Sequence, residues 1–146
     1  ETLAMLRACW TEDPVNFEAT ATGGQMVNMR ANPRPNRHIP IWVGGMSDAA
    51  LNRAIAFGDG WHAPGSNTKD LSAHIAKLRE VRPEDSFAIS TRLQWDGLEE
   101  NVDDMKRQIA EFRDIGVQHL VFQPRQRYAD DWHRSVEKLW DMTRDV

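Results

Sequence analysis

The alternation of short apolar runs with longer amphipathic stretches constrains the fold of this chain more than any other feature. Strand-type segments are expected at 41–43, 60–63, 87–93 and 117–122, and each is followed by a stretch whose apolar residues recur every three or four positions. Successive strand–helix units are typical of a parallel β-sheet connected by helices. The pattern fits both a (β/α) barrel and an open doubly wound sheet, because periodicity does not distinguish the two.

Apolar spacing and capping residues predict where the helices lie. Ser47 is positioned to cap the helix that follows the first strand. The plainest amphipathic stripe follows the third strand, and we expect its helix to pack on the sheet. The stripes are Leu71, Ile75 and Leu78; Val102, Met105, Ile109 and Phe112; and Trp132, Val136, Leu139 and Trp140.

The first forty residues differ in character, with a helix, a short hairpin and a proline-rich loop expected in that order. They are indicated by the stripe Leu3, Leu6 and Trp10, by alternating segments 15–18 and 26–29 around Gly23-Gly24, and by Pro33, Pro35 and Pro40. Because the chain starts within a helix and with Glu1 rather than Met, we expect it to be a piece of a longer protein.

Composition excludes several classes of protein. With 146 residues, 40% hydrophobic and 27% charged, the chain is expected to form one globular unit over 1–146. A net charge of −4 with scattered basic residues argues against a nucleic-acid partner. Cys9 is the single cysteine, which excludes an internal disulfide framework and a cysteine zinc site and fits a cytoplasmic protein. No apolar run is long enough to cross a membrane.

Ligands of parallel β/α folds bind at the carboxyl ends of the strands, which nominates the segments 44–48, 63–68, 94–97 and 123–127. In the first of these, Gly44-Gly45 allows close backbone approach, and the helix that starts at Ser47 offers free N–H groups suited to phosphate. A tight strand-to-helix turn explains the two glycines equally well. Gly65 and Ser66 precede the next helix start in the same way.

The aromatic and charged side chains near these segments have competing interpretations. Trp61 is expected in the core rather than in a pocket wall, and His62 either faces a ligand or points into the helix layer. Arg125 and Arg127 are candidate ligands for a carboxylate or phosphate. A solvated loop is the default interpretation of Arg30, Arg34, Arg37 and His38, with an acidic-ligand patch as the alternative.

Several segments resemble the signature region of luciferase-like monooxygenases and their deazaflavin-dependent relatives. They are Pro40-Ile41-Trp42-Val43-Gly44-Gly45-Met46-Ser47, Ala49-Ala50-Leu51-Asn52-Arg53-Ala54 and Gly58-Asp59-Gly60-Trp61. The upstream segment 6–17 and the stretch Asn32-Pro33-Arg34-Pro35 resemble the family in the same order. The resemblance therefore extends over nearly the whole chain.

The resemblance implies an α/β fold, a (β/α) barrel of the TIM type. Residues 1–146 would be its C-terminal half, the last four β/α units preceded by a helix and an insertion loop. It also implies FMN or F420 at the carboxyl face, with the catalytic residues upstream of Glu1. No metal is expected, because His38, His74, His119 and His133 do not cluster as metal ligands do. The residues that would hold the cofactor phosphate are Gly44, Gly45 and Met46 on one side and Ala63, Pro64, Gly65 and Ser66 on the other.

The function implied by the resemblance is a flavin- or F420-dependent oxidoreductase or monooxygenase acting on a small organic substrate. A non-catalytic flavin-binding or structural relative and an unrelated phosphate-binding barrel are the alternatives. Half of a barrel leaves two open edges and an uncovered apolar face, so a partner half or a second copy of the chain is expected to cover them.

Overall fold

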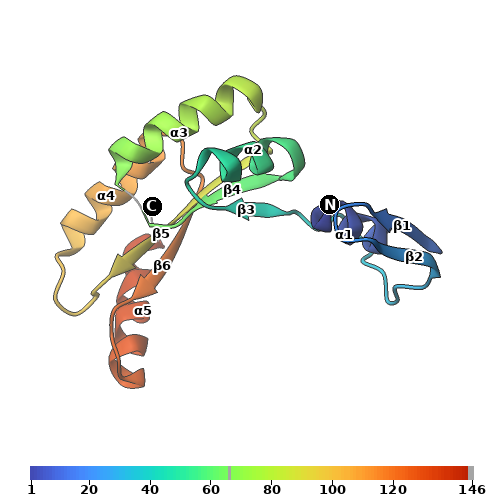
Figure 1. Cartoon of the computed structure of the whole chain (residues 1–146). Helices are drawn as coiled ribbons and strands as arrows, with labels where there is room; N and C mark the ends of the chain where they lie inside the picture. Colours follow the sequence, from blue (N-terminus) through green and yellow to red (C-terminus); the bar gives the residue numbers. More distant parts are fainter. Residues whose placement is uncertain (66, 145–146) are drawn as a thin grey trace. The chain divides into compact units, whose positions relative to one another are not determined.

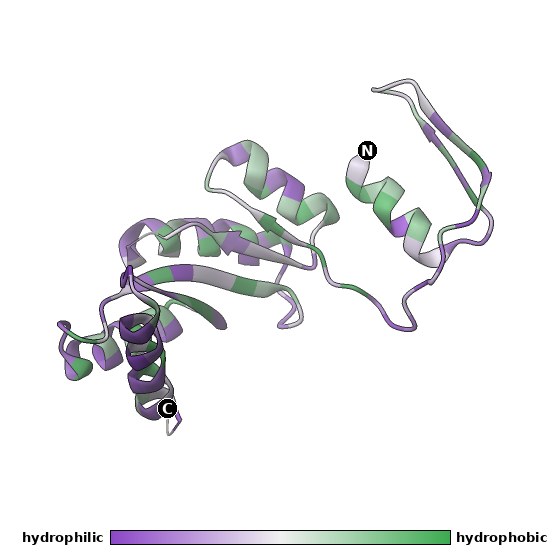
Figure 2. Ribbon diagram, turned by 90° about the horizontal axis from the view of Figure 1, so that it is seen from below, coloured by the Kyte–Doolittle hydropathy of each residue, from purple (hydrophilic) through white to green (hydrophobic). Residues whose placement is uncertain are grey.

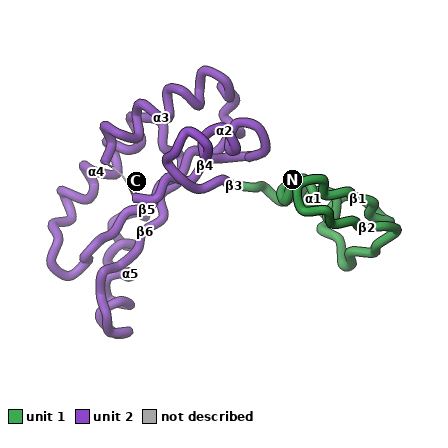
Figure 3. The backbone as a smooth tube through the Cα atoms, viewed as in Figure 1, with its two compact units in different colours: residues 1–41 green, residues 42–146 purple. Residues whose placement is uncertain are grey.

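The computed structural model describes residues 1–65 and 67–144, which form two compact units, Glu1–Ile41 and Trp42–Val146 (Figure 3). The first unit consists of helix α1 (Thr2–Thr11) and an antiparallel hairpin of β1 (Val15–Ala19) and β2 (Gly24–Met29). Val15 pairs with Met29 and is fully buried. The expected helix and hairpin are confirmed, whereas the assignment of residues 1–146 to a single barrel domain stays a prediction.

The second unit is a four-stranded sheet in the order β3-β4-β5-β6, and all three neighbouring pairs of strands are parallel (Figure 1). A helix follows each strand, which confirms the predicted α/β alternation. The elements are β3 (Trp42–Gly44), α2 (Asp48–Phe57), β4 (Gly60–Ala63), α3 (Thr68–Val81), β5 (Ala88–Trp95), α4 (Val102–Asp114), β6 (His119–Pro124) and α5 (Ala129–Thr143).

Side-chain caps fix the starts of three helices. The Ser47 hydroxyl accepts a hydrogen bond of 3.3 Å from the Ala50 amide, as expected from the sequence. Asn67 caps α3 in the same way, and Asn101 accepts from two amides of α4. Each cap satisfies amides of the first turn that have no partner inside the helix.

Two strands extend further than the sequence indicates. β5 continues to Trp95 and β6 to Pro124, so Gln94 and Gln123 lie in the sheet, in register with each other, rather than in the loops that follow. Both residues carry polar side chains, and a polar residue on one face does not interrupt a strand whose other face is buried.

One face of the sheet forms the core with the helices. Trp61, Ile89 and Leu93 project from β4 and β5 and are packed with Leu71 of α3 and Phe112 of α4. These side chains are less than a tenth exposed, and Trp61 is fully buried. The core interpretation of Trp61 and the predicted packing of the helix that carries Phe112 are therefore confirmed.

The opposite face carries mostly polar side chains, which corrects the expectation of an uncovered apolar face. Strand alternation places on it Trp42, His62, Ser90, Arg92, Gln94, His119, Val121 and Gln123. The rings of Trp42 and His119 meet edge to face at 5.1 Å, although they belong to the two outer strands. The sheet therefore curves toward this face, as a barrel sheet does.

The buried side of helix α5 includes only part of its apolar stripe, because Leu139 packs against the core whereas Trp132 and Trp140 are exposed. Ser135 and Met142 are buried, whereas Trp140 is 69% exposed, and most of the helix is hydrophilic (Figure 2). The buried Ser135 hydroxyl accepts a hydrogen bond of 2.9 Å from the Gly97 amide, which holds that side of the helix inward. No helix in the described part of the chain is long and apolar enough to cross a membrane.

Replacing Phe112 with Ala should lower the free energy of unfolding by about 3–5 kcal/mol, because it removes a ring that is 1% exposed from the centre of the core. Urea unfolding measures the change. Glu111→Ala is the matched control on the exposed side of α4, with a change expected within about 0.5 kcal/mol. Equal midpoints for both variants would contradict the packing of α4.

Candidate functional site

The two predicted cofactor-binding loops follow neighbouring strands at the same edge of the sheet. Gly44 ends β3 and pairs with His62, while Ala63 ends β4 and pairs with Thr91. Because both strands are parallel, the loops that contain Gly45, Met46, Pro64 and Gly65 leave the sheet at its carboxyl edge. Ser66, the remaining predicted residue, lies outside the described residues.

The conformation of Gly45 is explained by the turn that it makes. Its φ of +116° lies in the left-handed half of the map, and an added Cβ would be 2.9 Å from the Ala50 Cβ. Its amide donates to the His62 carbonyl at 3.3 Å, and its carbonyl accepts from the Trp61 indole at 2.7 Å. Gly45 is therefore required by the strand-to-helix turn, whether or not a ligand binds.

The donors that remain for an anion come from the next two residues. The amides of Met46 and Ser47 have no hydrogen-bond acceptor within the described residues, and they lie at the positive end of α2. Gly44 is exposed beside them, and the nearest atom to a Cβ added there would be the His62 carbonyl oxygen, at 3.8 Å. The edge of β3 is thus open to close approach by a ligand.

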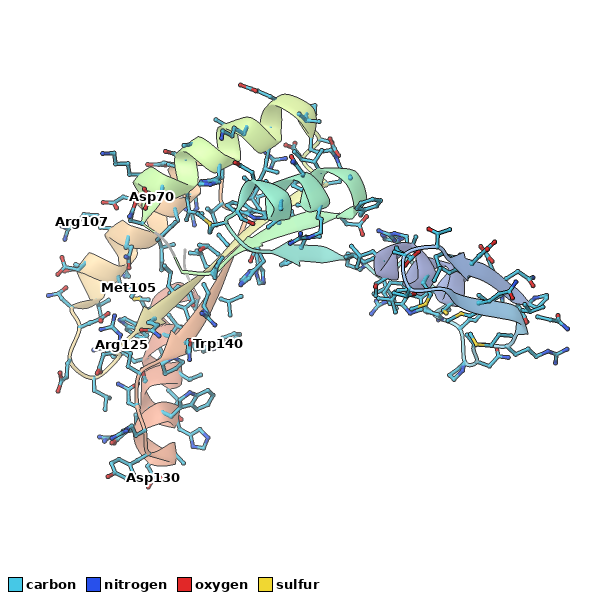
Figure 4. The ribbon with its side chains drawn as sticks, in the orientation of Figure 1. Asp70, Met105, Arg107, Arg125, Asp130 and Trp140 are labelled. Carbon is cyan, nitrogen blue, oxygen red and sulfur yellow. The ribbon has the colours of Figure 1, made fainter. Side chains whose placement is uncertain are left out.

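Pro64 and Gly65 border a cavity of about 640 Å³ at the carboxyl edge. Two of the residues that line it, Asp70 and Arg125, are labelled in Figure 4. The other residues that line it are Asn67, Asp70, Arg92, Leu93, Gln94, Gln108 and Arg125. Gly44, Gly45 and Met46 do not line this cavity. The structure therefore places the two loops on one edge without enclosing them in one pocket.

The charges of this cavity are only partly compensated. Arg125 forms an ion pair of 3.1 Å with Glu100, and the Asp70 carboxylate accepts from the Asn67 side chain at 2.8 Å. Arg92 has no ion pair within residues 1–65 and 67–144. Arg92 is thus the cation available to an anionic group at the edge of β5.

His62 points to the polar face of the sheet and not into the helix layer, which settles the two alternatives left open by the sequence. Its Nδ1 lies 2.9 Å from the Ser90 hydroxyl on β5. Burial, and then the charges of Arg92 and His119, lower the pKa of His62 below its ordinary value. The imidazole is therefore held in its neutral form more firmly than in solution.

Three residues near the site do not stand out in the sequence as functional: Ser90, Arg92 and His119. Ser90 and Arg92 alternate along β5 with the buried Ile89, Thr91 and Leu93, and His119 of β6 pairs with Ser90. The signal that could have identified Ser90 and Arg92 is the polar residue at every second position of β5, at positions 90, 92 and 94, which is typical of a strand with one polar face.

The proline-rich loop of the first unit forms a second cavity with α1. Arg7, Trp10, Arg34, Arg37 and His38 are among the residues that line its volume of about 600 Å³. Arg34 lies 3.5 Å from Asp13, and Arg30 does not line the cavity. The basic loop therefore contributes side chains to a cavity.

Four parallel strands in sequential order, with helices packed on one face and the sheet curved toward the other, are typical of part of a (β/α) barrel, and the helix N-termini at its carboxyl edge suit anions. The chain belongs to the luciferase-like monooxygenase family, whose family model matches residues 1–140. Both the predicted fold and the resemblance seen in the sequence are thereby confirmed.

Two solved structures share this fold. An F420-dependent secondary alcohol dehydrogenase, in complex with an F420-acetone adduct, is 12% identical with a TM-score of 0.75, covering 98% of this chain and 60% of that one. The coenzyme F420-dependent tetrahydromethanopterin reductase of Methanopyrus kandleri is 13% identical with a TM-score of 0.69, covering 94% and 59%.

Among curated sequences, proteins of Mycobacterium tuberculosis and Mycobacterium bovis that are described as uncharacterized are 36% identical over 84 residues. The matched region is 58% of this chain and 28% of those proteins. The chain thus spans about three fifths of the two solved structures and aligns with less than a third of these relatives.

Replacing Gly45 with Ala should lower the free energy of unfolding by about 1–3 kcal/mol, because the new side chain meets Ala50 and strains a positive φ. Gly44→Ala is the matched control, since the neighbouring residue has ordinary backbone geometry and space for a Cβ. Chemical unfolding of both variants measures the difference. Equal stabilities would contradict the turn described for Gly45.

The lowered pKa of His62 should make part of the stability depend on pH. At this imidazole the unfolded chain binds a proton more tightly than the folded chain, so stability falls as pH drops below the ordinary value of 6.5. Between about pH 7.5 and about pH 5, His62→Gln should lose less stability than the unmodified protein. His133→Gln, on the exposed side of α5, is the control and should follow the unmodified protein.

Proposed function

We propose that this chain is part of a flavin- or deazaflavin-dependent oxidoreductase that acts on a small organic substrate, and that it provides the binding site for the cofactor phosphate. Membership of the luciferase-like family supports the class of enzyme. The two structural neighbours use coenzyme F420, which favours F420 over FMN as the cofactor. When bound, the cofactor supplies the hydride or oxygen chemistry.

The observation that carries the proposal is the pair of amides at the start of α2 that have no partner within residues 1–65 and 67–144. A phosphate oxygen accepts strongly from backbone N–H groups at a helix N-terminus. The amides of Met46 and Ser47 meet this requirement, and Gly44 leaves the adjoining strand edge without a side chain. Gly45 shapes the turn that exposes both amides.

The second loop fits the phosphate less completely than the first. The Gly65 amide donates to the Ala63 carbonyl at 3.1 Å, and the Asp70 carboxylate lies in the adjoining cavity. We assign Ala63, Pro64 and Gly65 to the cofactor site as the far wall, with Arg92 as its cation. Ser66, which lies outside the described residues, is assigned to the cofactor site on the sequence alone. Repulsion by Asp70 places the phosphate nearer to α2 than to α3.

The test is a binding titration of the protein with F420 and with FMN, each followed by its visible absorbance. Gly44→Val should weaken binding by about tenfold, because the side chain blocks approach to the amides without straining the backbone. Inorganic phosphate should compete with the cofactor. Glu111→Ala, on the exposed side of α4, is the control and should bind as the unmodified protein does.

Two outcomes would contradict the proposal. Retention of neither cofactor by the protein would remove the assigned class of activity. Unchanged affinity of Gly44→Val for a cofactor that does bind would move the phosphate away from α2.

A further inference from the structure

We propose that His62, Ser90 and His119 form a proton-transfer chain across the polar face of the sheet. The three residues lie at matching register on β4, β5 and β6. The Ser90 hydroxyl oxygen is 2.9 Å from Nδ1 of His62 and 3.0 Å from Nδ1 of His119. Ser90 is fully buried, so it exchanges hydrogen bonds with these two imidazoles rather than with bulk water.

A single hydroxyl between two imidazoles imposes opposite tautomers on them. The hydroxyl has one proton and donates to one Nδ1, so it must accept from the other Nδ1, which then carries a proton. The two neutral rings therefore share one Nδ1 proton, and two arrangements of the chain exist. In one arrangement His62 donates to Ser90 and Ser90 donates to His119, and in the other both directions are reversed.

Interconversion of the two arrangements moves a proton across the three strands. A proton that binds Nε2 of His119 allows its Nδ1 proton to pass to Ser90, whose own proton passes to Nδ1 of His62. His62 then releases a proton from Nε2, so one proton enters and one leaves, and no charge accumulates. Neither Nε2 has a hydrogen-bond partner within the described residues, so both ends of the chain are open.

The surroundings favour the neutral form of His62 and fix the orientation of His119. Burial lowers the pKa of His62 most. Arg92 on β5 and His119 on β6, the charged and titratable groups that face His62, lower the pKa of His62 further. Trp42 of β3 contacts the His119 ring edge to face and holds its orientation. If both rings carried an Nδ1 proton, the buried Ser90 hydroxyl would accept from both and its own proton would have no acceptor.

The chain ends next to the site assigned to the cofactor. Gly44 lies in the same row, paired with His62 on the adjacent strand. Oxidation of an alcohol transfers a hydride to the cofactor and leaves one hydroxyl proton to be removed, and the reverse reaction takes one up. This part of the inference rests on the proposed function: His62 would exchange that proton with the ligand through Nε2, and His119 would pass it on.

The experiment is nitrogen NMR of the histidine rings in the ¹⁵N-labelled protein at about pH 8, without any cofactor. The Nδ1–H populations of His62 and His119 should sum to about one proton, and both rings should show the same exchange rate. In Ser90→Ala the sum should depart from one and the shared rate should disappear, whereas Ser90→Thr should restore both. Thr91→Val removes the neighbouring buried hydroxyl on the helix side and should change neither.

The possible results separate this inference from the proposed function. Independent tautomers or unequal exchange rates in the unmodified protein would overturn the proton-transfer chain, whether or not a cofactor binds. Adding F420 or FMN should shift the His62 resonances and leave those of His133 on α5 unchanged. Bound cofactor, detected by absorbance, without any shift at His62 would overturn the role of the chain at the site. Shared tautomers without cofactor binding would support the chain and contradict the proposed function.

Discussion

The hydrogen bond from the Trp61 indole to the Gly45 carbonyl links the core of the sheet to the start of α2. The indole is fully buried, so its N–H requires an acceptor, and the Gly45 carbonyl provides one at 2.7 Å. Gly45 makes this turn with a positive φ, and the same turn leaves the amides of Met46 and Ser47 without a partner among the residues that the structure describes. The packing of one tryptophan thus sets the geometry of the edge that we assign to the phosphate.

The sequence allowed the order of the elements to be predicted, but not which way their side chains face. The stripe that includes Phe112 and the cap at Ser47 were recognisable because helix packing and capping leave local patterns at fixed spacing. The exposure of Trp140 could not be predicted, because the contact between Ser135 and Gly97 that orients α5 joins residues 38 positions apart and leaves no local pattern. The ends of β5 and β6 were missed because Gln94 and Gln123 resemble loop residues.

The candidate site was predictable to a similar extent. The rule that ligands bind at strand ends identified the loops after β3 and β4, and the structure places both at one edge. Which acceptor each backbone amide faces could not be predicted from the sequence, since the partners of the Gly45 and Gly65 amides depend on turn geometry. Arg92 was missed because its role depends on which face of β5 it occupies, and that face is set by pairing with residues distant in the chain.

Strand β5 shows why stability and chemistry are coupled in this unit. Ile89, Thr91, Leu93 and Trp95 face the helices, while Ser90, Arg92 and Gln94 face the other way. Because side chains alternate with a period of two, shifting β5 by one residue would expose the apolar set and bury the Arg92 guanidinium without a partner. The hydrophobic packing that stabilises the sheet therefore also fixes the register that aligns His62, Ser90 and His119, so the polar row is maintained by the core on the opposite face.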